Sequence, residues 1–269
     1  MYLQGYNTLI LSDLHLGAET SRAREATRVL QENRFQRLIL LGDIFADLNF
    51  ARLTKEHWKF LGYIRKLSNP KRSIEIVWVE GNHDHGLTNI MSHLVGVRVY
   101  QEYTWVYRGR RHIAIHGHQF DGFQVNRVRL SQWGTSLYLQ LQKLDLKTKP
   151  IARMIDRLNT RWLRMSEKVA SGALAYARHH KIERIFCGHT HEALHVERDG
   201  IDYYNSGGWV DSRLTYLTID ELGVQIHEYG ERTDDRDSGE ERGEADSPLA
   251  DFADESGLLE DVEYESVGR

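Results

Sequence analysis

The 269-residue sequence predicts an α/β protein built around a parallel β-sheet. In its first 120 residues, short apolar runs typical of buried strands alternate with longer segments of helical periodicity, which favours strand–helix–strand units with right-handed crossovers. Several of the apolar runs end in Asp, Asn or His, and the carboxyl ends of parallel strands are where ligands bind in such sheets. The length and the hydrophobic content of 41% suit one large domain with an insertion or a tail.

The expected parallel unit consists of three strands separated by two helices. The first helix carries Ala23, Ala26 and Val29 on one face at helical spacing. The second helix ends before Asn69-Pro70, because proline interrupts helical hydrogen bonding. In chain order we expect a strand over 8–11, a helix over 19–34, a strand over 37–41, a helix over 55–67 and a strand over 74–79.

The rest of the chain combines further short strands with one long helical segment. Helices are missing between the late strands, so we expect antiparallel hairpins that complete a second sheet. In order, these elements are strands over 97–100, 104–107 and 112–115, a helical insertion over 126–181, and strands over 184–187, 194–197, 201–205, 214–219 and 224–229.

Charge is distributed unevenly along the chain. Residues 231–269 contain 15 acidic and 4 basic side chains, a net charge of −11, so the net charge of −4 for the whole chain leaves +7 on residues 1–230. The acidic segment has few apolar residues, and we expect a disordered tail, solvated or folding on a partner. We therefore expect a main domain over 1–125 and 182–230, an inserted helical cap over 126–181 and a tail over 231–269.

The composition excludes several classes of protein. The single cysteine, Cys187, rules out a disulfide framework and suits a reducing cytoplasm; we expect it to be a buried strand residue. We find no run approaching the roughly 20 apolar residues of a membrane-spanning helix. The first residues also lack the features of a secretory signal.

Five predicted strands end in clusters of metal-ligating residue types. Carboxylate, amide oxygen and imidazole suit Mn, Fe, Zn or Co, and the lack of thiolates argues against a closed structural zinc. Each motif alone is more often a turn or a cap, but five together at strand ends predict a site for two metal ions, about 3.5–4 Å apart, that hydrolyses a phosphate ester. The candidate ligands are Asp13, His15, Asp43, Asn82, His116, His189 and His191.

In order, the motifs read LSDLHLG, LLGDIFAD, VEGNHDHG, IHGHQFD and CGHTHEA, and they resemble those of the calcineurin-like metallophosphoesterase superfamily. The later segment YYNSGGWVDS is similar to one in its UDP-2,3-diacylglucosamine hydrolase branch. The resemblance implies a four-layer α/β/β/α sandwich, with two divalent metal ions, most simply Mn, and Fe, Zn or Co as alternatives. It also implies hydrolysis of a pyrophosphate bond in lipid A synthesis.

Carried over to this sequence, the resemblance assigns a role to each motif residue. His83 would contact the phosphate and the leaving oxygen, and Asp84 would orient its imidazole ring. Asp47 would support the site or begin a helix. The first metal would bind Asp13, His15 and His191, the second would bind Asn82, His116 and His189, and Asp43 would bridge the two.

The sequence departs from that branch at two positions. His118 stands where many members of the branch have Asp, and it is either a site residue or a solvent-facing histidine. Gly208 also replaces an Asp. Neither change affects the seven candidate ligands, so the assignment as a hydrolase is retained. The two departures weaken only the assignment of the substrate.

The helical insertion is strongly basic. Residues 126–181 contain 12 Lys or Arg against three acids, and an apolar stripe with an adjoining basic stripe predicts an amphipathic helix. We expect a lid that binds a lipid-linked or nucleotide-containing phosphate substrate through Arg157, Arg161, Trp162 and Arg164, with peripheral contact to an anionic membrane. The alternative is an ordinary helical hairpin whose arginines are merely solvated. We expect no nucleic acid, because the basic residues lie on one insertion and the aromatic ones fall on its apolar stripes.

The most direct interpretation is therefore a cytoplasmic enzyme, peripheral to the inner membrane, that hydrolyses UDP-2,3-diacylglucosamine. Two alternatives remain. The enzyme acts on another phosphodiester, nucleotide or phospholipid, or the chain is a non-catalytic adaptor with the same fold.

Overall fold

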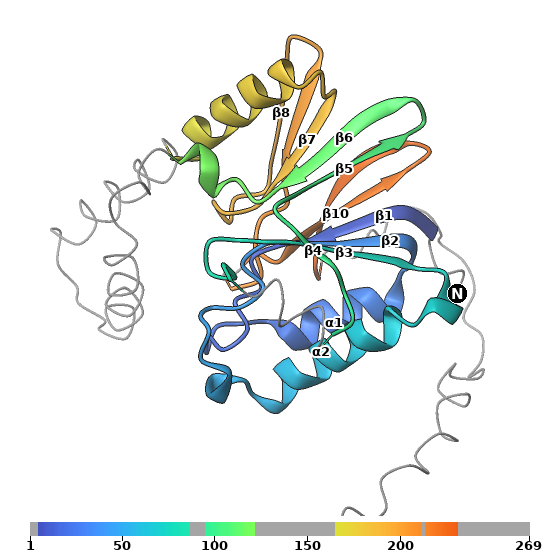
Figure 1. Ribbon diagram of the computed structural model, residues 1–269, viewed down its shortest axis with the longest axis vertical. Helices are drawn as coiled ribbons and strands as arrows, with labels where there is room; N and C mark the ends of the chain where they lie inside the picture. The colour runs from blue at the N-terminus through green and yellow to red at the C-terminus, as the bar shows by residue number, and fades with distance from the viewer. Residues whose placement is uncertain (1–4, 87–94, 122–164, 211–212, 231–269) are drawn as a thin grey trace, which may run out of the picture. The chain divides into compact units, whose positions relative to one another are not determined.

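The computed structural model describes residues 5–86, 95–121, 165–210 and 213–230. Within these residues the chain forms two β-sheets with helices on their outer faces (Figure 1). The predictions for residues 126–164 and 231–269, which include most of the expected cap and the whole acidic tail, lie outside the described part of the chain. No helix among the described residues is long and apolar enough to span a membrane.

The first sheet has the strand order β11-β10-β1-β2-β3-β4. Strands β1 to β4 are parallel, as the alternation of strands and helices predicts, and in the register Leu11 lies opposite Leu40 and Leu41 opposite Val79. The carboxyl ends of β1, β2 and β3 therefore meet at one edge. The bounds are β1 (Gly5–Leu11), β2 (Arg34–Leu41), β3 (Glu75–Val79), β4 (Val99–Tyr100), β10 (Thr215–Asp220) and β11 (Gly223–Glu228).

The second sheet has the strand order β5-β6-β7-β9-β8. Its central strands β6, β7 and β9 are parallel, and hairpins add β5 and β8 at the edges. The bounds are β5 (Glu102–Tyr107), β6 (Arg110–Ile115), β7 (Arg184–Cys187), β8 (Leu194–Arg198) and β9 (Ile201–Asn205).

The expectation that all late strands complete the second sheet is wrong for β10 and β11. This hairpin joins the first sheet, where β10 pairs antiparallel with β1 and places Thr8 opposite Ile219. The hairpin thus covers an edge of β1 that would otherwise expose unpaired backbone groups. Parallel pairing of β7 with β9 is a second difference. It is possible because the intervening β8 lies at the sheet edge beyond β9 and runs antiparallel to it.

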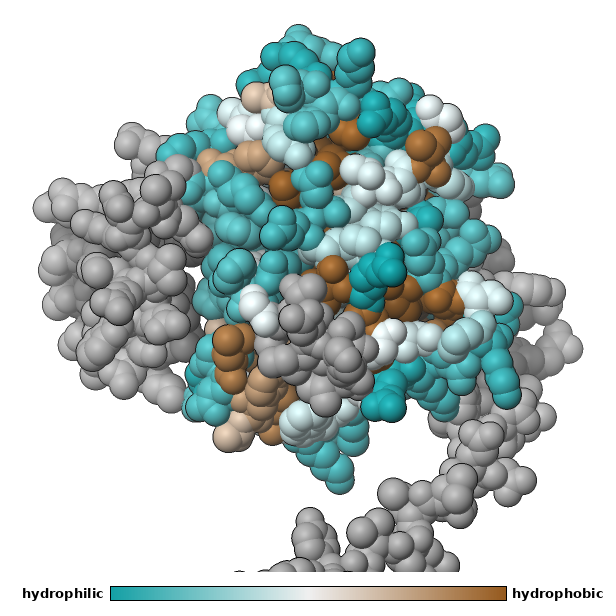
Figure 2. All heavy atoms as spheres, viewed as in Figure 1, coloured by the Kyte–Doolittle hydropathy of each residue, from teal (hydrophilic) through white to brown (hydrophobic). Residues whose placement is uncertain are grey.

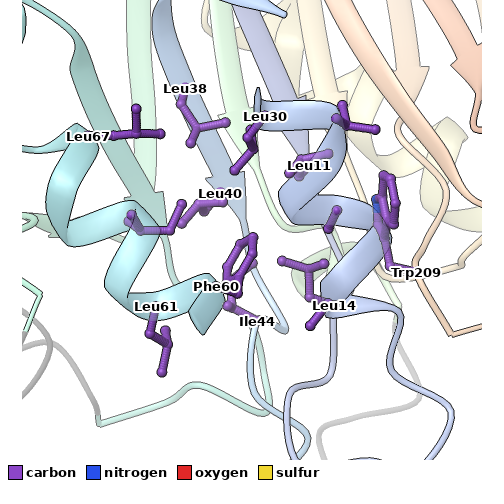
Figure 3. Packing of buried hydrophobic residues seen from close by; sticks show 14 of the residues in the cluster. Leu11, Leu14, Leu30, Leu38, Leu40, Ile44, Phe60, Leu61, Leu67 and Trp209 are labelled. Atoms are coloured by element: carbon purple, nitrogen blue, oxygen red, sulfur yellow. The ribbon is translucent and has the colours of Figure 1, made fainter. Parts of the chain in front are cut away.

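Helices α1 (Ala23–Glu32) and α2 (Lys55–Leu67) cover the outer face of the first sheet (Figure 1). Figure 3 shows Leu30 of α1 and Phe60 and Leu67 of α2 on the side of their helices that faces Leu38 and Leu40 on β2. Helix α1 is shorter than the predicted 19–34. The preceding turn is held by the Ser21 hydroxyl, which donates to the Leu14 carbonyl, and by Gly17 at φ +100°.

Residues 165–179 form a helix on the outer face of the second sheet (Figure 1). Ala173, Leu174 and Ala177 of this helix pack against Ile113 and Ile185. A further cluster that includes Ile39, Val79 and Phe186 fills the space between the two sheets. The order helix, sheet, sheet, helix confirms the expected four-layer α/β/β/α arrangement.

Few large hydrophobic side chains are exposed among the described residues. On the face seen in Figure 2 the described surface is mainly hydrophilic, and hydrophobic residues form separate patches. The exposed members are Leu48, Trp58, Val106, Leu222 and Ile226. Cys187 is buried at the end of β7, as expected.

Candidate metal centre

The seven candidate ligands lie on loops that directly follow five strands. Asp13 and His15 follow β1, Asp43 follows β2 and Asn82 follows β3, while His116 follows β6, and His189 and His191 follow β7. Backbone hydrogen bonds join these loops beyond the strand ends. The Asp13 amide donates to the Gly42 carbonyl at 3.0 Å, and the Gly188 amide donates to the His116 carbonyl at 3.0 Å. Each of these bonds joins loops of one sheet, and the His189 amide, which donates to the Asp13 carboxylate at 3.0 Å, joins the loops of the two sheets.

Asp13, His15 and His191 form one group able to hold a cation. The His191 Nε2 atom is 3.3 Å from the nearer carboxylate oxygen of Asp13 and 3.1 Å from the His15 Nε2 atom. Burial, followed by the charge of His191, lowers the pKa of His15 to about 4. His15 is therefore a neutral imidazole at pH 7, the form that binds a metal ion.

Asp43, His116 and His189 form a second such group, and Asp43 also belongs to a third with His15 and His83. The Asp43 carboxylate thus lies between the two ligand sets, where a bridging ligand would have to be. Burial alone would raise the pKa of Asp43, but the nearby charge of His116 outweighs it and holds this pKa well below its usual value. Asp43 is consequently an ionised carboxylate despite being buried.

Two buried polar atoms of the candidate ligands, one of them in this second group, lack hydrogen-bond partners, and a metal ion would suit them. Asn82 Oδ1 and His116 Nε2 are buried, and within the described part of the chain neither has a hydrogen-bond partner. His116 Nδ1 donates to the Leu41 carbonyl at 3.0 Å, which directs Nε2 toward Asp43 at 3.3 Å. Leaving such atoms unpaired costs about 1–3 kcal/mol each, a cost that coordination to a cation would remove.

The backbone of the ligand loops adopts conformations that few residues tolerate. Nine non-glycine residues among those described have positive φ, and five of them are candidate ligands, with φ between 46° and 71°. Left-handed conformations cost energy and cluster at functional sites, where the surrounding structure holds them in place. These five ligands are Asp13, His15, Asp43, His189 and His191.

Glycines allow the loops to approach one another closely. A Cβ atom on Gly81 would lie 2.2 Å from the Asp43 amide nitrogen, and one on Gly188 would lie 2.4 Å from an Asp13 carboxylate oxygen. No real Cβ makes contacts this short, so both positions require glycine for steric reasons.

His83 and Asp84 have partners that differ from the expected pair. His83 Nδ1 donates to the Ala46 carbonyl at 2.7 Å, and its Nε2 lies 3.8 Å from the Asp43 carboxylate. Asp84 does not orient this ring; its two carboxylate oxygens accept the Ile44 and Phe45 amides at 3.0 and 2.9 Å. Asp84 therefore supports the loop after Asp43, because a buried carboxylate needs hydrogen-bond donors and two backbone amides are within reach.

Three further side chains lie near the centre. The sequence analysis assigned no role to Asp121 and left two alternative roles each for His118 and Asp47. Asp121 lies 3.4 Å from His189 Nε2, and only its nearness to the HGH motif could have indicated this. The His118 ring lies 5.5 Å from the His116 ring, so it borders the centre, and its Nδ1 is buried. Asp47 accepts the Asn49 amide and pairs with Arg52, which stabilises the loop.

The expected substrate contacts are outside the described residues. They are Arg157, Arg161, Trp162 and Arg164, and the cap remains a prediction. Gly208, the second departure from the branch, lies against the first ligand set: a Cβ atom there would be 3.3 Å from the His191 side chain.

A model of the calcineurin-like phosphoesterase family matches residues 6–193. No curated protein matches the chain. Among solved structures, an archaeal phosphodiesterase is 14% identical with a TM-score of 0.46, covering 82% of this chain and 98% of its own. The phosphoesterase YfcE of E. coli is 14% identical with a TM-score of 0.45, covering 80% and 88%. Vps29 of Entamoeba histolytica complexed with zinc is 14% identical with a TM-score of 0.41, covering 82% and 97%. At such values these likenesses carry no argument about the reaction, which depends on the site itself.

Proposed function

The chain belongs to the calcineurin-like phosphoesterase family, and from this premise we propose that it hydrolyses phosphate esters or anhydrides with two divalent metal ions. The observation that carries the proposal is the meeting of donors from five loops around the shared Asp43 carboxylate. Asp13, His15 and His191 would hold one ion, Asn82, His116 and His189 the other, and Asp43 both. When bound, such a pair supplies Lewis acidity and lowers the pKa of water.

The protein's own side chains would orient the substrate, and His83 would donate a proton to it. The Ala46 carbonyl accepts from His83 Nδ1, so Nε2 is the ring nitrogen that faces the centre. When protonated, this Nε2 would donate to a phosphoryl oxygen or to the leaving oxygen. Asp84 would act on the reaction only indirectly, by holding the loop that follows Asp43.

For the substrate, we propose UDP-2,3-diacylglucosamine or a close analogue, cleaved at its pyrophosphate bond to UMP and 2,3-diacylglucosamine 1-phosphate. The YYNSGGWVDS segment and the net charge of +9 on residues 126–181 support this choice. A basic, apolar-lined segment suits a diphosphate that carries acyl chains at an anionic membrane surface. The proposal includes Mn as the metal and a location at the cytoplasmic face of the membrane.

The test compares substrates on the same metal-loaded protein. We expect UMP release from UDP-2,3-diacylglucosamine with Mn²⁺ present and its loss with a chelator. A parallel panel would include a nucleotide, a phospholipid and a small chromogenic phosphodiester. Turnover of the panel without UMP release would contradict the lipid substrate and retain the hydrolase.

Metal binding without turnover of any of these compounds would instead favour a non-catalytic binding role. The complete donor set argues against that role, because an adaptor has no need to retain seven candidate ligands that include a shared carboxylate.

A further inference from the structure

Asn205 ends β9 beside the metal-binding loop and is fully buried. In the parallel pairing of β7 with β9 it lies opposite Cys187, the residue that immediately precedes Gly188 and His189. A fully buried amide needs partners for both its oxygen and its NH₂ group. The identity of these partners shows what Asn205 holds in place.

The amide group of Asn205 connects the loop to the turn that follows β9. Its Nδ2 donates to the Gly188 carbonyl at 2.6 Å and to the Thr190 hydroxyl at 3.0 Å. These two acceptors lie on either side of His189. Its Oδ1 accepts the Gly207 amide at 2.9 Å. One side chain thus contacts the loop on both sides of a candidate ligand, through the backbone at Gly188 and through the side chain at Thr190.

The segment after β9 that Asn205 contacts is also hydrogen bonded to the first sheet. The Ser206 hydroxyl is hydrogen bonded to that of Ser12 at 2.7 Å, and Thr215 on β10 donates to the Ser206 carbonyl at 2.7 Å. Ser12 immediately precedes Asp13, whose carboxylate accepts the His189 amide at 3.0 Å. Asn205 therefore lies in a continuous set of hydrogen bonds that joins donor loops of both sheets.

These hydrogen bonds restrain a loop whose backbone conformation is unfavourable. His189 and His191 have φ of 71° and 55°, which unrestrained histidines rarely adopt. Such conformations persist only where surrounding contacts hold them. The bonds from Asn205 to Gly188 and Thr190 are contacts of that kind, because they restrain the backbone next to each strained histidine.

We propose that Asn205 is a positioning residue that holds the loop 188–191 so that His189 and His191 reach the metal pair together with Asp13. The inference rests on the proposed function, since it concerns ligands of the proposed metal ions. Asn205 touches neither metal nor substrate; it acts through the loop. Outer residues that orient ligands typically contribute about 10- to 100-fold to metal affinity.

The test measures metal binding separately from activity. Metal-free full-length protein is titrated with Mn²⁺ against a fluorescent chelator, and the visible absorption of the Co²⁺ form reports ligand geometry. Asn205→Leu removes the bonds to Gly188, Thr190 and Gly207 and a fourth, from Nδ2 to the Tyr203 hydroxyl at 3.2 Å. We expect about 10- to 100-fold weaker Mn²⁺ binding and altered Co²⁺ bands. Thr190→Val removes one acceptor and keeps the shape of the side chain, so we expect a smaller loss in the same direction.

Thr218→Val is the matched control. Thr218 is equally buried and hydrogen bonded, to His227 at 2.7 Å, but it lies within β10. We expect this variant to lose thermal stability and keep its Mn²⁺ affinity. Equal loss of affinity in the control, or unchanged affinity in both loop variants, would overturn the positioning role. If Asn205→Leu does not fold, Thr190→Val decides. Failure of the unmodified protein to bind any metal would instead refute the proposed function itself.

Discussion

The protonation states of individual side chains at this centre depend on one another. Asp43 is ionised although buried, and His116 Nε2 lies 3.3 Å from its carboxylate without making a hydrogen bond among the described residues. Burial would lower the pKa of His116, but the neighbouring Asp43 carboxylate raises it to about 9. The two groups attract each other, and a cation would take the place of the proton between them.

Asp43→Asn tests the bridging carboxylate directly. The substitution keeps the size of the side chain but removes its charge, so both ligand sets lose their shared anion. We expect turnover to fall by at least about 100-fold and metal content to decrease, while the circular dichroism spectrum is unchanged. Metal analysis and steady-state assays on the same sample measure this. Full turnover in folded protein carrying Asp43→Asn would contradict the two-metal mechanism.

Gly188→Ala tests the close approach of two ligand loops. The added methyl group would lie 2.4 Å from an Asp13 oxygen, so either the loop or the carboxylate must move. We expect a loss of about 1–3 kcal/mol in the free energy of unfolding, measured with urea, together with weaker metal binding. Gly62→Ala is the control, because nothing lies within 4 Å of its Cβ position and helix α2 should gain about 0.5–1 kcal/mol. Unchanged stability at Gly188 would contradict the clash.

Residue by residue, the sequence identifies candidate metal ligands that the structure brings together, but it does not show how these side chains are supported. Asp13, Asp43 and His189 follow apolar runs, and a motif at a strand end is a local feature that can be read directly. The support of Asp84 by backbone amides and the role of Asn205 depend on contacts between residues distant in the chain. No spacing rule encodes those contacts, so they required the structure.

Among the elements, the parallel strands and α2 agree with their sequence patterns, whereas β10 and β11 do not. Helix α2 has the bounds that the sequence predicts because its start and the following Asn69-Pro70 carry local signals. The hairpin of β10 and β11 has only alternating hydrophobicity, which predicts strands without specifying a sheet. Its pairing with β1 follows from which edge is available, a property of the assembled fold.

Strand β6 carries a buried histidine whose titration links the stability of the second sheet to pH. His112 is fully buried, and its ring stacks on Trp105 at 5.0 Å and on Phe186 at 5.8 Å. Burial lowers its pKa from 6.5 to about 4. Between these values the unfolded chain binds a proton that the folded chain does not, so stability falls as the pH decreases from about 6.5 to about 4.

The corresponding prediction uses His112→Phe, which keeps a ring in the stack and removes the titration. Lowering the pH from 7 to 4.5 should cost the unmodified protein about 2–3 kcal/mol more in unfolding free energy than the variant. Urea unfolding with a chelator present measures both, so that metal binding does not contribute. His179→Gln, at an exposed position, should behave as the unmodified protein does. Equal pH dependence in His112→Phe would show that another group is responsible.

For the molecule as a whole, the centre depends on how the two sheets pack against each other, which the sequence alone does not predict. Asp13, His15, Asp43 and Asn82 come from the first sheet, while His116, His189 and His191 come from the second. The apolar cluster between the sheets, which includes Phe186 and Leu217, sets their separation. The order of the motifs indicated that the ligands converge, but the division of each ligand set between two sheets emerged only from the fold.

This division predicts that metal ions link the two sheets and stabilise the fold. Each ligand set contains donors from both sheets, so an ion bound to the folded state opposes their separation. At a free Mn²⁺ concentration of 100 times the dissociation constant, one site would add about 2.7 kcal/mol, which for a domain of this size raises the melting temperature by roughly 5–10 °C over chelator-treated protein. Differential scanning calorimetry measures the shift. Asp43→Asn should lose most of it, whereas Thr218→Val should melt lower and retain it. Identical melting with chelator and with Mn²⁺ would show that the two sheets share no bound metal.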